Sequence, residues 1–300
     1  MSTLHDQVAV VTGCGKPDGM GQAIARTLAS AGARVVVTDK TARGVPNDRQ
    51  RLLGEEPTSG LEDLADALRS EGYDVVAALG DISEPADAER MVGTAVERFG
   101  RLDILVNTAA APQGADRRDV EDVPLEAWDL LINVNLRGTY LMCRAAVPHL
   151  RSRRYGRIVN ISSMAGLTAA PFSAAYSASK AGVIGLTRAL SMDLGPWGIT
   201  VNALCPGLVA TSRAVLDPSP DLDVDAALAA RGRAIPVGRV GLPDDIAAAV
   251  AFLASPGAGY ITGQAIPIDG GGLTPFPLPQ PPAETAATAT TTATTAAPTT

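Results

Sequence analysis

Short runs of apolar, mostly β-branched residues alternate with longer stretches of helical character along most of the chain. The apolar runs predict strands at Val8–Thr12, Arg34–Thr38, Asp74–Ala78, Asp103–Asn107, Arg157–Ile161, Ile199–Leu204 and Gln264–Ile268. The stretches between them predict helices at Gly21–Ala31, Glu84–Phe99, Leu125–Leu150, Ala174–Leu194 and Pro243–Ala254. Strands that alternate with helices form right-handed βαβ units around a buried parallel sheet. The pattern therefore predicts an α/β fold, doubly wound, with a central parallel sheet and helices on both of its faces.

Two segments lack this alternation. Lys40–Gly60 is polar and contains two prolines, which predicts an insertion between the second strand and the next helix. Residues 276–300 are rich in proline and then almost wholly threonine and alanine, a composition with little to bury, so they predict a disordered tail. Because no linker divides the rest, residues 1–275 are predicted to form a single domain.

Composition and charge narrow the range of partners. The chain has 25 Lys and Arg against 32 Asp and Glu, a net charge of −7, which disfavours nucleic acid or an anionic membrane as the main partner. The first residues lack a basic run, and no apolar run approaches the roughly 18 to 20 residues that span a bilayer. Three scattered cysteines and two histidines form neither a disulfide framework nor a metal-ligand pattern. These features predict a cytoplasmic protein without a metal.

Glycines follow the first predicted strand and open the first helix, where Gly13, Gly19 and Gly21 lie with Met20 among them. Glycine lets the backbone approach a pyrophosphate closely, and the N-terminus of the helix offers unpaired N–H groups. The order strand, glycine loop, helix is typical of the Rossmann dinucleotide-binding fold. The loop therefore predicts a dinucleotide site.

Asp39 ends the second strand, roughly 20 residues after this loop, where an acid hydrogen-bonds the adenosine ribose hydroxyls. A 2′-phosphate there would face a carboxylate, at a cost of about 1–4 kcal/mol. Asp39 therefore favours NAD over NADP as the cofactor, although Lys16 and Lys40 are nearby cations that could weaken this preference.

Tyr176 and Lys180 are spaced i,i+4 at the start of a predicted helix, so they share one face of it. A nearby ammonium group, together with the positive charge of an oxidised nicotinamide, would stabilise a phenolate and lower the pKa of Tyr176 toward the range of a general base. The preceding strand ends at Ser162 and Ser163, and ligands bind at this edge of an open parallel sheet.

With these motifs in place, the chain resembles the short-chain dehydrogenase/reductase family in its ordinary single-domain form, from Val8 to about Gly272. The glycine loop resembles the family's loop with two residues inserted within Lys16–Asp18, and Thr108 and Ala110 depart from its Asn-Asn-Ala-Gly stretch. The Tyr-x-x-x-Lys spacing argues against the divergent enoyl-reductase branch, which also lengthens the glycine loop. The resemblance implies catalytic residues at Asn135, Ser163, Tyr176 and Lys180, and cofactor contacts at Gly13, Gly19, Met20, Gly21, Asp39, Asp81, Ile82, Asn107, Ala109, Tyr176, Lys180, Pro206, Gly207, Val209 and Thr211.

The resemblance also implies a role for each catalytic residue. Tyr176 exchanges the proton of the substrate hydroxyl while a hydride passes to or from the nicotinamide. Ser163 polarises the same substrate oxygen. Lys180 lowers the pKa of Tyr176 and holds the nicotinamide ribose, and Asn135 holds a water that connects Lys180 to solvent.

We therefore expect an NAD-dependent oxidoreductase that interconverts a secondary alcohol and a ketone. The segment Ser212–Arg239 should cover the substrate, and its apolar composition favours a neutral, hydrophobic or cyclic molecule. Arg117 and Arg118 are interpreted as solvated surface. The alternatives are an NADPH-dependent ketoreductase of carrier-bound 3-oxoacyl chains and, from another class, a dinucleotide-sensing protein without catalysis.

The predicted helices Leu125–Leu150 and Ala174–Leu194 follow adjacent strands and should lie side by side. Small and apolar residues on them are expected to remain as spare surface, namely Leu141, Ala145, Val183 and Leu190. Pairing that surface across a two-fold axis predicts a homodimer or homotetramer.

Overall fold

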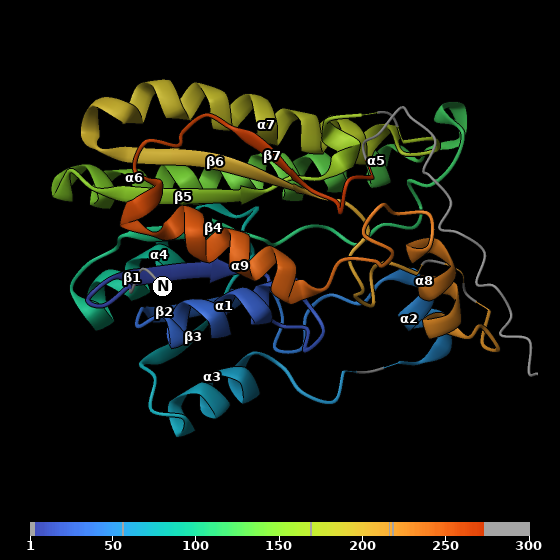
Figure 1. The fold of residues 1–300 in the computed structure, drawn as a ribbon, viewed down its shortest axis with the longest axis horizontal. Helices are drawn as coiled ribbons and strands as arrows, with labels where there is room; N and C mark the ends of the chain where they lie inside the picture. The colour runs from blue at the N-terminus through green and yellow to red at the C-terminus, as the bar shows by residue number, and fades with distance from the viewer. Residues whose placement is uncertain (1–3, 56, 169, 216, 218, 273–300) are drawn as a thin grey trace, which may run out of the picture.

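The computed structural model describes residues 4–55, 57–168, 170–215, 217 and 219–272. A seven-stranded sheet in the order β3-β2-β1-β4-β5-β6-β7 runs through the molecule, and all of its paired strands are parallel (Figure 1). The strands are β1 (Val8–Thr12), β2 (Arg34–Asp39), β3 (Val75–Leu79), β4 (Ile104–Asn107), β5 (Gly156–Ile161), β6 (Ile199–Pro206) and β7 (Ala265–Ile268). The predicted α/β class with a parallel sheet is confirmed. The predicted tail at 276–300 lies outside the described residues.

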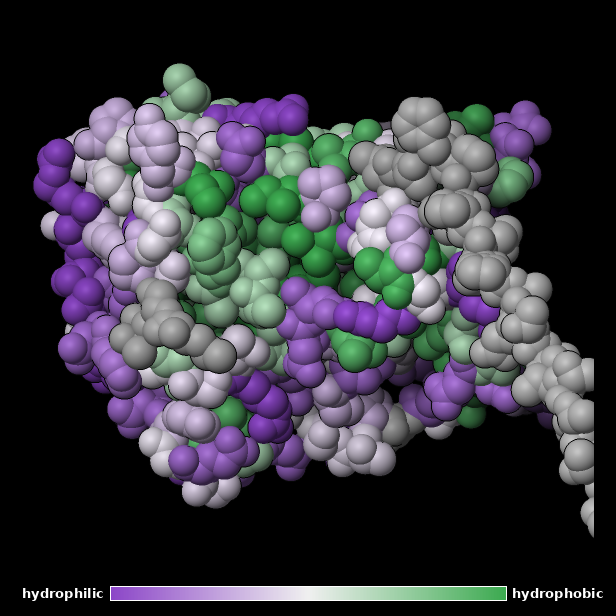
Figure 2. Space-filling model, in the orientation of Figure 1, coloured by the Kyte–Doolittle hydropathy of each residue, from purple (hydrophilic) through white to green (hydrophobic). Residues whose placement is uncertain are grey.

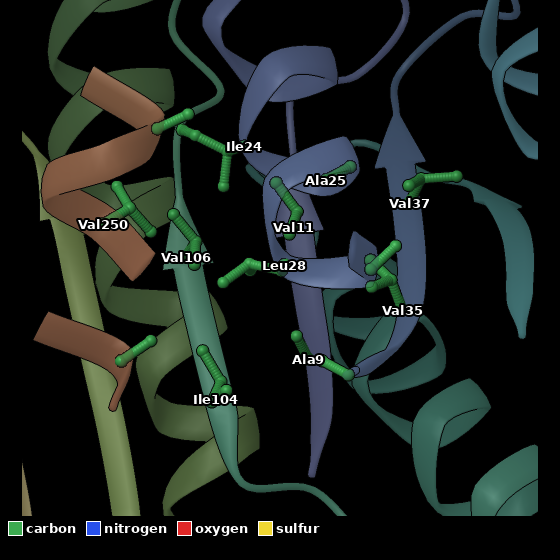
Figure 3. Close-up of a cluster of buried hydrophobic side chains, with 14 of the residues drawn as sticks. Ala9, Val11, Ile24, Ala25, Leu28, Val35, Val37, Ile104, Val106 and Val250 are labelled. Atoms are coloured by element: carbon green, nitrogen blue, oxygen red, sulfur yellow. The ribbon is translucent and has the colours of Figure 1, made fainter. Parts of the chain in front are cut away.

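Helices cover both faces of the sheet. One face carries α1 (Met20–Ser30), α3 (Leu61–Ser70) and α9 (Pro243–Ala254), and the other carries α4 (Pro85–Phe99), α6 (Thr139–Arg153) and α7 (Ala174–Leu194). Successive side chains of a strand point to opposite faces, so each strand serves two cores. Val11 of β1 packs with Leu28 of α1 and Val250 of α9 in the first core (Figure 3). Its neighbour Val10 packs in the second core with Met91 and Met142.

The strand order reverses direction between β1 and β4, and the carboxyl ends of all these strands meet at one edge of the sheet. A crevice opens at such a switch point because the loops that leave β1 and β4 diverge toward opposite faces. This arrangement brings the glycine loop, the end of β2 and the start of α7 to one place.

The long helix predicted at Leu125–Leu150 is instead three pieces. A short α5 (Leu125–Leu131) leads into a π-helical segment at Ile132–Gly138, and α6 then continues past Pro148 to Arg153. Hydrophobic periodicity does not show this local change in helical winding. The three pieces follow one another directly in the sequence, and apolar residues recur through all of them.

Two further helices lie in segments where none was expected. The insertion holds α2 (Asp48–Leu53), and the segment after β6 holds α8 (Val224–Gly232). Asn47 and Gln50 form a capping box at the start of α2, with Gln50 N donating to Asn47 Oδ1 at 2.8 Å. That pair was a readable helix-start signal in the sequence. No helix among the described residues is long and apolar enough to cross a membrane.

Candidate active site

A pocket of about 840 Å³ lies at the carboxyl edge of the sheet. All but two of the residues predicted to bind the cofactor or act in catalysis line it: Gly13, Gly19, Met20, Gly21, Asp39, Asp81, Ile82, Ala109, Ser163, Tyr176, Lys180, Pro206, Gly207, Val209 and Thr211. The exceptions are Asn107 and Asn135, which lie beneath its wall. The fold thus gathers residues from distant parts of the chain around one cavity.

The glycine loop has the geometry of a cradle for phosphate. A Cβ on Gly21 would lie 2.2 Å from the carbonyl oxygen of Gly13, so only glycine fits there. Gly13 has a positive φ of 77° and lies against the backbone of Ala109. The helix that follows, α1, has glycine as its N-cap, no side-chain cap and no acidic residue in its first turn. Its first N–H groups are therefore available to an anion, and the residues present fit a dinucleotide pyrophosphate.

Asp39 closes the adenosine side of the pocket. Its Oδ2 accepts a hydrogen bond from Gly15 N and its Oδ1 accepts one from Lys40 N, each at 2.7 Å. Burial raises the pKa of Asp39, and the donating backbone N–H groups oppose that rise. Each carboxylate oxygen can accept a second bond, so Asp39 can still receive the ribose hydroxyls that the sequence predicted.

Lys16 and Lys40, which could weaken a preference for NAD over NADP, both have partners within the protein. Lys40 Nζ forms an ion pair with Asp81 Oδ2 at 2.7 Å, and Lys16 Nζ donates to Gln50 Oε1 at 2.5 Å. Burial, followed by the charge of Arg213, lowers the pKa of Lys16 to about 8. Both ammonium groups are therefore already held by side chains of the protein.

Ser163, Tyr176 and Lys180 converge on the opposite side of the pocket. Ser163 follows β5 and Tyr176 and Lys180 share one face of α7. Lys180 Nζ donates to the carbonyl of Ile161 at 2.8 Å and lies 5.8 Å from the centroid of the Tyr176 ring. Burial, then the charge of Arg213, lowers the pKa of Lys180 to about 8. At neutral pH the group is therefore still mainly an ammonium.

This geometry agrees with comparisons to known proteins. A family profile described as enoyl-(acyl carrier protein) reductase matches residues 13–272. A curated relative from Thauera aromatica, named (2S)-[(R)-hydroxy(phenyl)methyl]succinyl-CoA dehydrogenase subunit BbsD, is 37% identical over 268 residues, covering 89% of this chain and 97% of its own. The chain belongs to the short-chain dehydrogenase/reductase family.

Other members of the family give the same result. A 3-oxoacyl-[acyl-carrier-protein] reductase from Synechocystis is 34% identical over 90% of this chain and 98% of its own. The crystal structure of levodione reductase superposes with a TM-score of 0.77 and 30% identity, covering 89% of this chain and 97% of that one. The resemblance stated from the motifs is confirmed, and the chain is an oxidoreductase of this family.

Asn135 lies in the π-helical segment and connects two segments that border the pocket. Its Oδ1 accepts a hydrogen bond from Ala111 N at 2.8 Å, and its Nδ2 donates to Ser179 Oγ at 3.0 Å. The amide thereby ties the loop after β4 to α7. The predicted water at Asn135 stays a prediction, whereas the bracing role was not expected from the sequence.

Asn107 is buried at the end of β4 and is not part of the pocket lining. Its Nδ2 donates to Asn160 Oδ1 at 2.8 Å, which joins the ends of β4 and β5. Its Oδ1 is buried without a hydrogen-bond partner among the described residues. Thr12 also joins neighbouring strands at this edge of the sheet. Its Oγ1 accepts hydrogen bonds from Thr108 N and Ala109 N, each at 3.0 Å, which fix the loop after β4 to the end of β1.

In the protein without a cofactor, the pKa of Tyr176 lies above its ordinary value, and the lowering expected beside an oxidised nicotinamide stays a prediction. Burial of the phenol raises it above its ordinary value, while a hydrogen bond with Ser163 and the charges of Arg213 and Arg117 act in the opposite direction. Lys180 alone therefore does not lower this pKa in the free protein. The spacing of Tyr176 and Lys180 predicted that they share one helical face, but it could not predict how far the phenol is buried from solvent.

Three groups at the pocket were missed by the sequence analysis. Arg213 donates to the carbonyls of Ala110 at 2.7 Å and Ala111 at 3.1 Å, across the crevice from its own segment. Arg231 of α8 and Arg117 also line the pocket. Both are exposed, so the interpretation of Arg117 as solvated agrees with the structure, whereas its place at the pocket was not predicted. A surface arginine and a pocket arginine look alike in sequence unless the path of the loop is known.

The two inserted segments meet the substrate-covering segment at one residue. Asp18 of the glycine loop accepts a hydrogen bond from Ser212 N, and Asn47 Nδ2 donates to Ser212 O at 2.9 Å. The first contact joins the glycine loop to the segment after β6, and the second joins the Lys40–Gly60 insertion to the same segment. The insertion therefore lies at the wall of the pocket.

Proposed function

We propose that the protein is an NAD-dependent dehydrogenase that interconverts a secondary alcohol and a ketone, with Tyr176 as the residue that exchanges the hydroxyl proton. A bound nicotinamide dinucleotide would supply the hydride acceptor or donor. The meeting of Ser163, Tyr176 and Lys180 at the wall of a pocket with a phosphate cradle carries this proposal. A protein that only senses a dinucleotide needs no such trio beside the nicotinamide end.

Each of the three side chains contributes to this reaction, and Lys180 contributes in two ways. Ser163 donates a hydrogen bond to the substrate oxygen and holds it within reach of the Tyr176 hydroxyl. Tyr176 takes or returns the proton of that oxygen. Lys180 supplies a positive charge on the same helical face, which favours the phenolate during transfer, and donates to the ribose hydroxyls.

The choice of NAD rests on the adenosine side of the pocket. Asp39 presents a carboxylate where a 2′-phosphate would lie, and Lys40 and Lys16 are held by Asp81 and Gln50. Charge repulsion there disfavours NADP.

The second candidate is an NADPH-dependent reductase of carrier-bound 3-oxoacyl chains. The identity with the Synechocystis reductase favours it. Asp39 opposes it, and so does the engagement of both lysines. The preferred cofactor therefore separates the two candidates.

Apolar side chains on the pocket wall support a substrate with a hydrophobic or cyclic body. They include Leu130, Val134, Phe172 and Leu208. The arginines on the same wall do not support the further expectation that the substrate is neutral. We also propose that the enzyme acts in the cytoplasm as a homodimer or homotetramer.

A panel of secondary alcohols with NAD and with NADP, followed by the absorbance of the reduced cofactor, tests the proposal. We expect turnover with NAD and little with NADP. Turnover of 3-oxoacyl thioesters with NADPH at a higher kcat/KM than any NAD-linked reaction would favour the second candidate instead.

A further inference from the structure

Three arginines line the pocket without a carboxylate partner. Arg117 follows β4, Arg213 follows β6 and Arg231 belongs to α8. Within the part of the chain that the structure describes, their hydrogen bonds go to neutral acceptors only, and none forms an ion pair. These acceptors are Gln113 Oε1, the carbonyls of Ala110 and Ala111, and the carbonyl of Ala214.

Two other cations on the pocket wall pair with carboxylates, Lys40 with Asp81 at 2.7 Å and Arg51 with Asp48 at 2.8 Å. Lys16 and Lys180 donate to neutral acceptors, as the three arginines do. These five cations outnumber Asp18 and Asp39, the carboxylates of the lining outside an ion pair, so the pocket holds an excess of positive charge in a chain whose net charge is −7. Like charges gathered around a partly desolvated cavity repel one another, and an anionic ligand relieves that repulsion.

Arg213 serves the dinucleotide side of this excess. Both of its hydrogen bonds go to the loop after β4, to the carbonyls of Ala110 and Ala111, and its charge acts on Asp39 and Asp18. We therefore assign Arg117 and Arg231, and not Arg213, to the substrate.

Arg117 lies at the reacting centre. Its Cζ is 5.9 Å from the centroid of the Tyr176 ring, and its side chain reaches the pocket from the loop after β4. The adjacent Asp116 forms no ion pair with Arg117 among the described residues, although its charge opposes that of Arg117 at Tyr176. Asp116 is only 1% exposed, accepts a hydrogen bond from Gly114 N at 2.9 Å and is not part of the pocket lining.

We propose that the substrate carries an anionic group, a carboxylate or a phosphate, which Arg117 binds beside Tyr176 and to which Arg231 adds a second positive charge on the same pocket wall. The inference rests on the proposed alcohol–ketone chemistry and specifies its substrate. The substrate is an apolar hydroxy or oxo compound with an acidic group. The anion can be a carboxylate of the substrate itself or a phosphate of a carrier such as coenzyme A, and guanidinium recognises both through charge-assisted hydrogen bonds.

Matched substrates and matched variants test this. A hydrophobic hydroxy acid, its methyl ester and its coenzyme A thioester are compared by kcat/KM with NAD, in the wild type, Arg117→Ala, Arg117→Lys and Arg118→Ala. Arg118 is the neighbouring exposed arginine outside the pocket lining, so Arg118→Ala is the control. The readout is the ratio of kcat/KM for the charged substrate to that for the ester, because any effect of Arg117 through Tyr176 is common to both and cancels.

The ratio is expected to fall at least tenfold in Arg117→Ala, to recover in part in Arg117→Lys and to stay at the wild-type value in Arg118→Ala. A fall for the hydroxy acid identifies a carboxylate, and a fall for the thioester alone identifies a carrier phosphate. A ratio that Arg117→Ala leaves unchanged for both overturns the inference.

The proposed function fails separately, through a wild-type enzyme that reduces NAD with no member of the panel. Binding then still decides the inference. Calorimetric titration of the oxo acid into the NAD complex should show at least tenfold weaker binding in Arg117→Ala than in the wild type. Equal affinity in the two proteins, or no binding to either, overturns the inference.

Discussion

Lys40 Nζ lies 2.7 Å from Asp81 Oδ2, so the cation that follows Asp39 in the chain is held by the acid at the end of the next strand. This pair determines what a 2′-phosphate would meet at the adenosine end of the pocket. The phosphate would face the Asp39 carboxylate, and Lys40 would have to leave a short ion pair to reach it.

The first prediction concerns cofactor choice. Calorimetric titration should show NAD binding at least tenfold more tightly than NADP, a gap of about 1.4 kcal/mol. Asp39→Ala should narrow the gap mainly by strengthening NADP binding. Lys40→Met should leave the preference for NAD in place, because Lys40 already belongs to Asp81. Equal affinities in the wild type would contradict this account.

A second prediction follows from the pKa of Lys180, which burial lowers to about 8 in the free protein. Only the protonated amine can donate to the ribose hydroxyls with the help of its charge. The NAD dissociation constant should therefore be flat below pH 8 and rise above it, approaching tenfold per pH unit, since binding then requires proton uptake.

Variants assign this pH dependence to one lysine. Lys180→Met should bind NAD weakly and without the rise. Lys16→Met should keep the rise, although the pKa of Lys16 is also about 8, because its amine donates to Gln50. An NAD affinity that stays constant from pH 7 to pH 10 would show that the Lys180 proton plays no part in binding.

The contacts at Ser212 predict slow release of the cofactor. Asp18 and Asn47 hold Ser212 across the crevice, so the dinucleotide must break these bonds to leave. Asp18→Ala should raise the NAD dissociation rate several-fold in stopped-flow displacement. Glu55→Ala is the control, because Glu55 lies in the Lys40–Gly60 insertion and pairs with Arg49 at 2.6 Å rather than with Ser212. Identical rates in all three proteins would show that the Asp18–Ser212 contact plays no part in cofactor retention.

Assembly is predicted from helices that lie side by side, although two of the expected contact residues are wrong. Leu141 and Val183 are only 5% and 1% exposed in a single chain, so they offer little surface to a partner, and Leu141 packs in the second core. Apolar surface is instead found between α7 and α9, beside the edge strand β7, where Phe252 of α9 is 55% exposed (Figure 2). Light scattering after size exclusion should give a dimer or tetramer at micromolar concentration, and a fully active monomer would contradict the prediction.

The sequence was most informative where a periodic pattern meets a fixed motif. β1 and α7 lie where the pattern placed them, and the glycine loop, Asp39, Ser163, Tyr176 and Lys180 line one pocket as expected. Parallel strands force their carboxyl ends to one edge, so motifs that follow strands must meet.

Side-chain partners across the crevice were beyond the reach of the sequence. Three contacts depend on how long loops fold against one another. They are the hydrogen bond from Lys16 to Gln50, the hydrogen bond from Arg213 to the carbonyl of Ala110, and the contact of Arg117 with the ring of Tyr176. The degree of burial of each side chain could not be predicted from the sequence either. The spacing of Tyr176 and Lys180 predicted that they share one helical face, whereas the raised pKa of Tyr176 comes from the burial of its phenol in the folded protein.

The central claim is that Tyr176 transfers the proton in an NAD-linked reaction. Its most direct test is the kcat for NAD reduction by an accepted alcohol in Tyr176→Phe, with NAD binding measured on the same protein. Tyr140→Phe is the control, because Tyr140 is an exposed tyrosine of α6 outside the pocket. We predict a fall in kcat of roughly a hundredfold or more in Tyr176→Phe with NAD still bound, and a normal rate in Tyr140→Phe. A near-normal kcat in Tyr176→Phe would contradict the account.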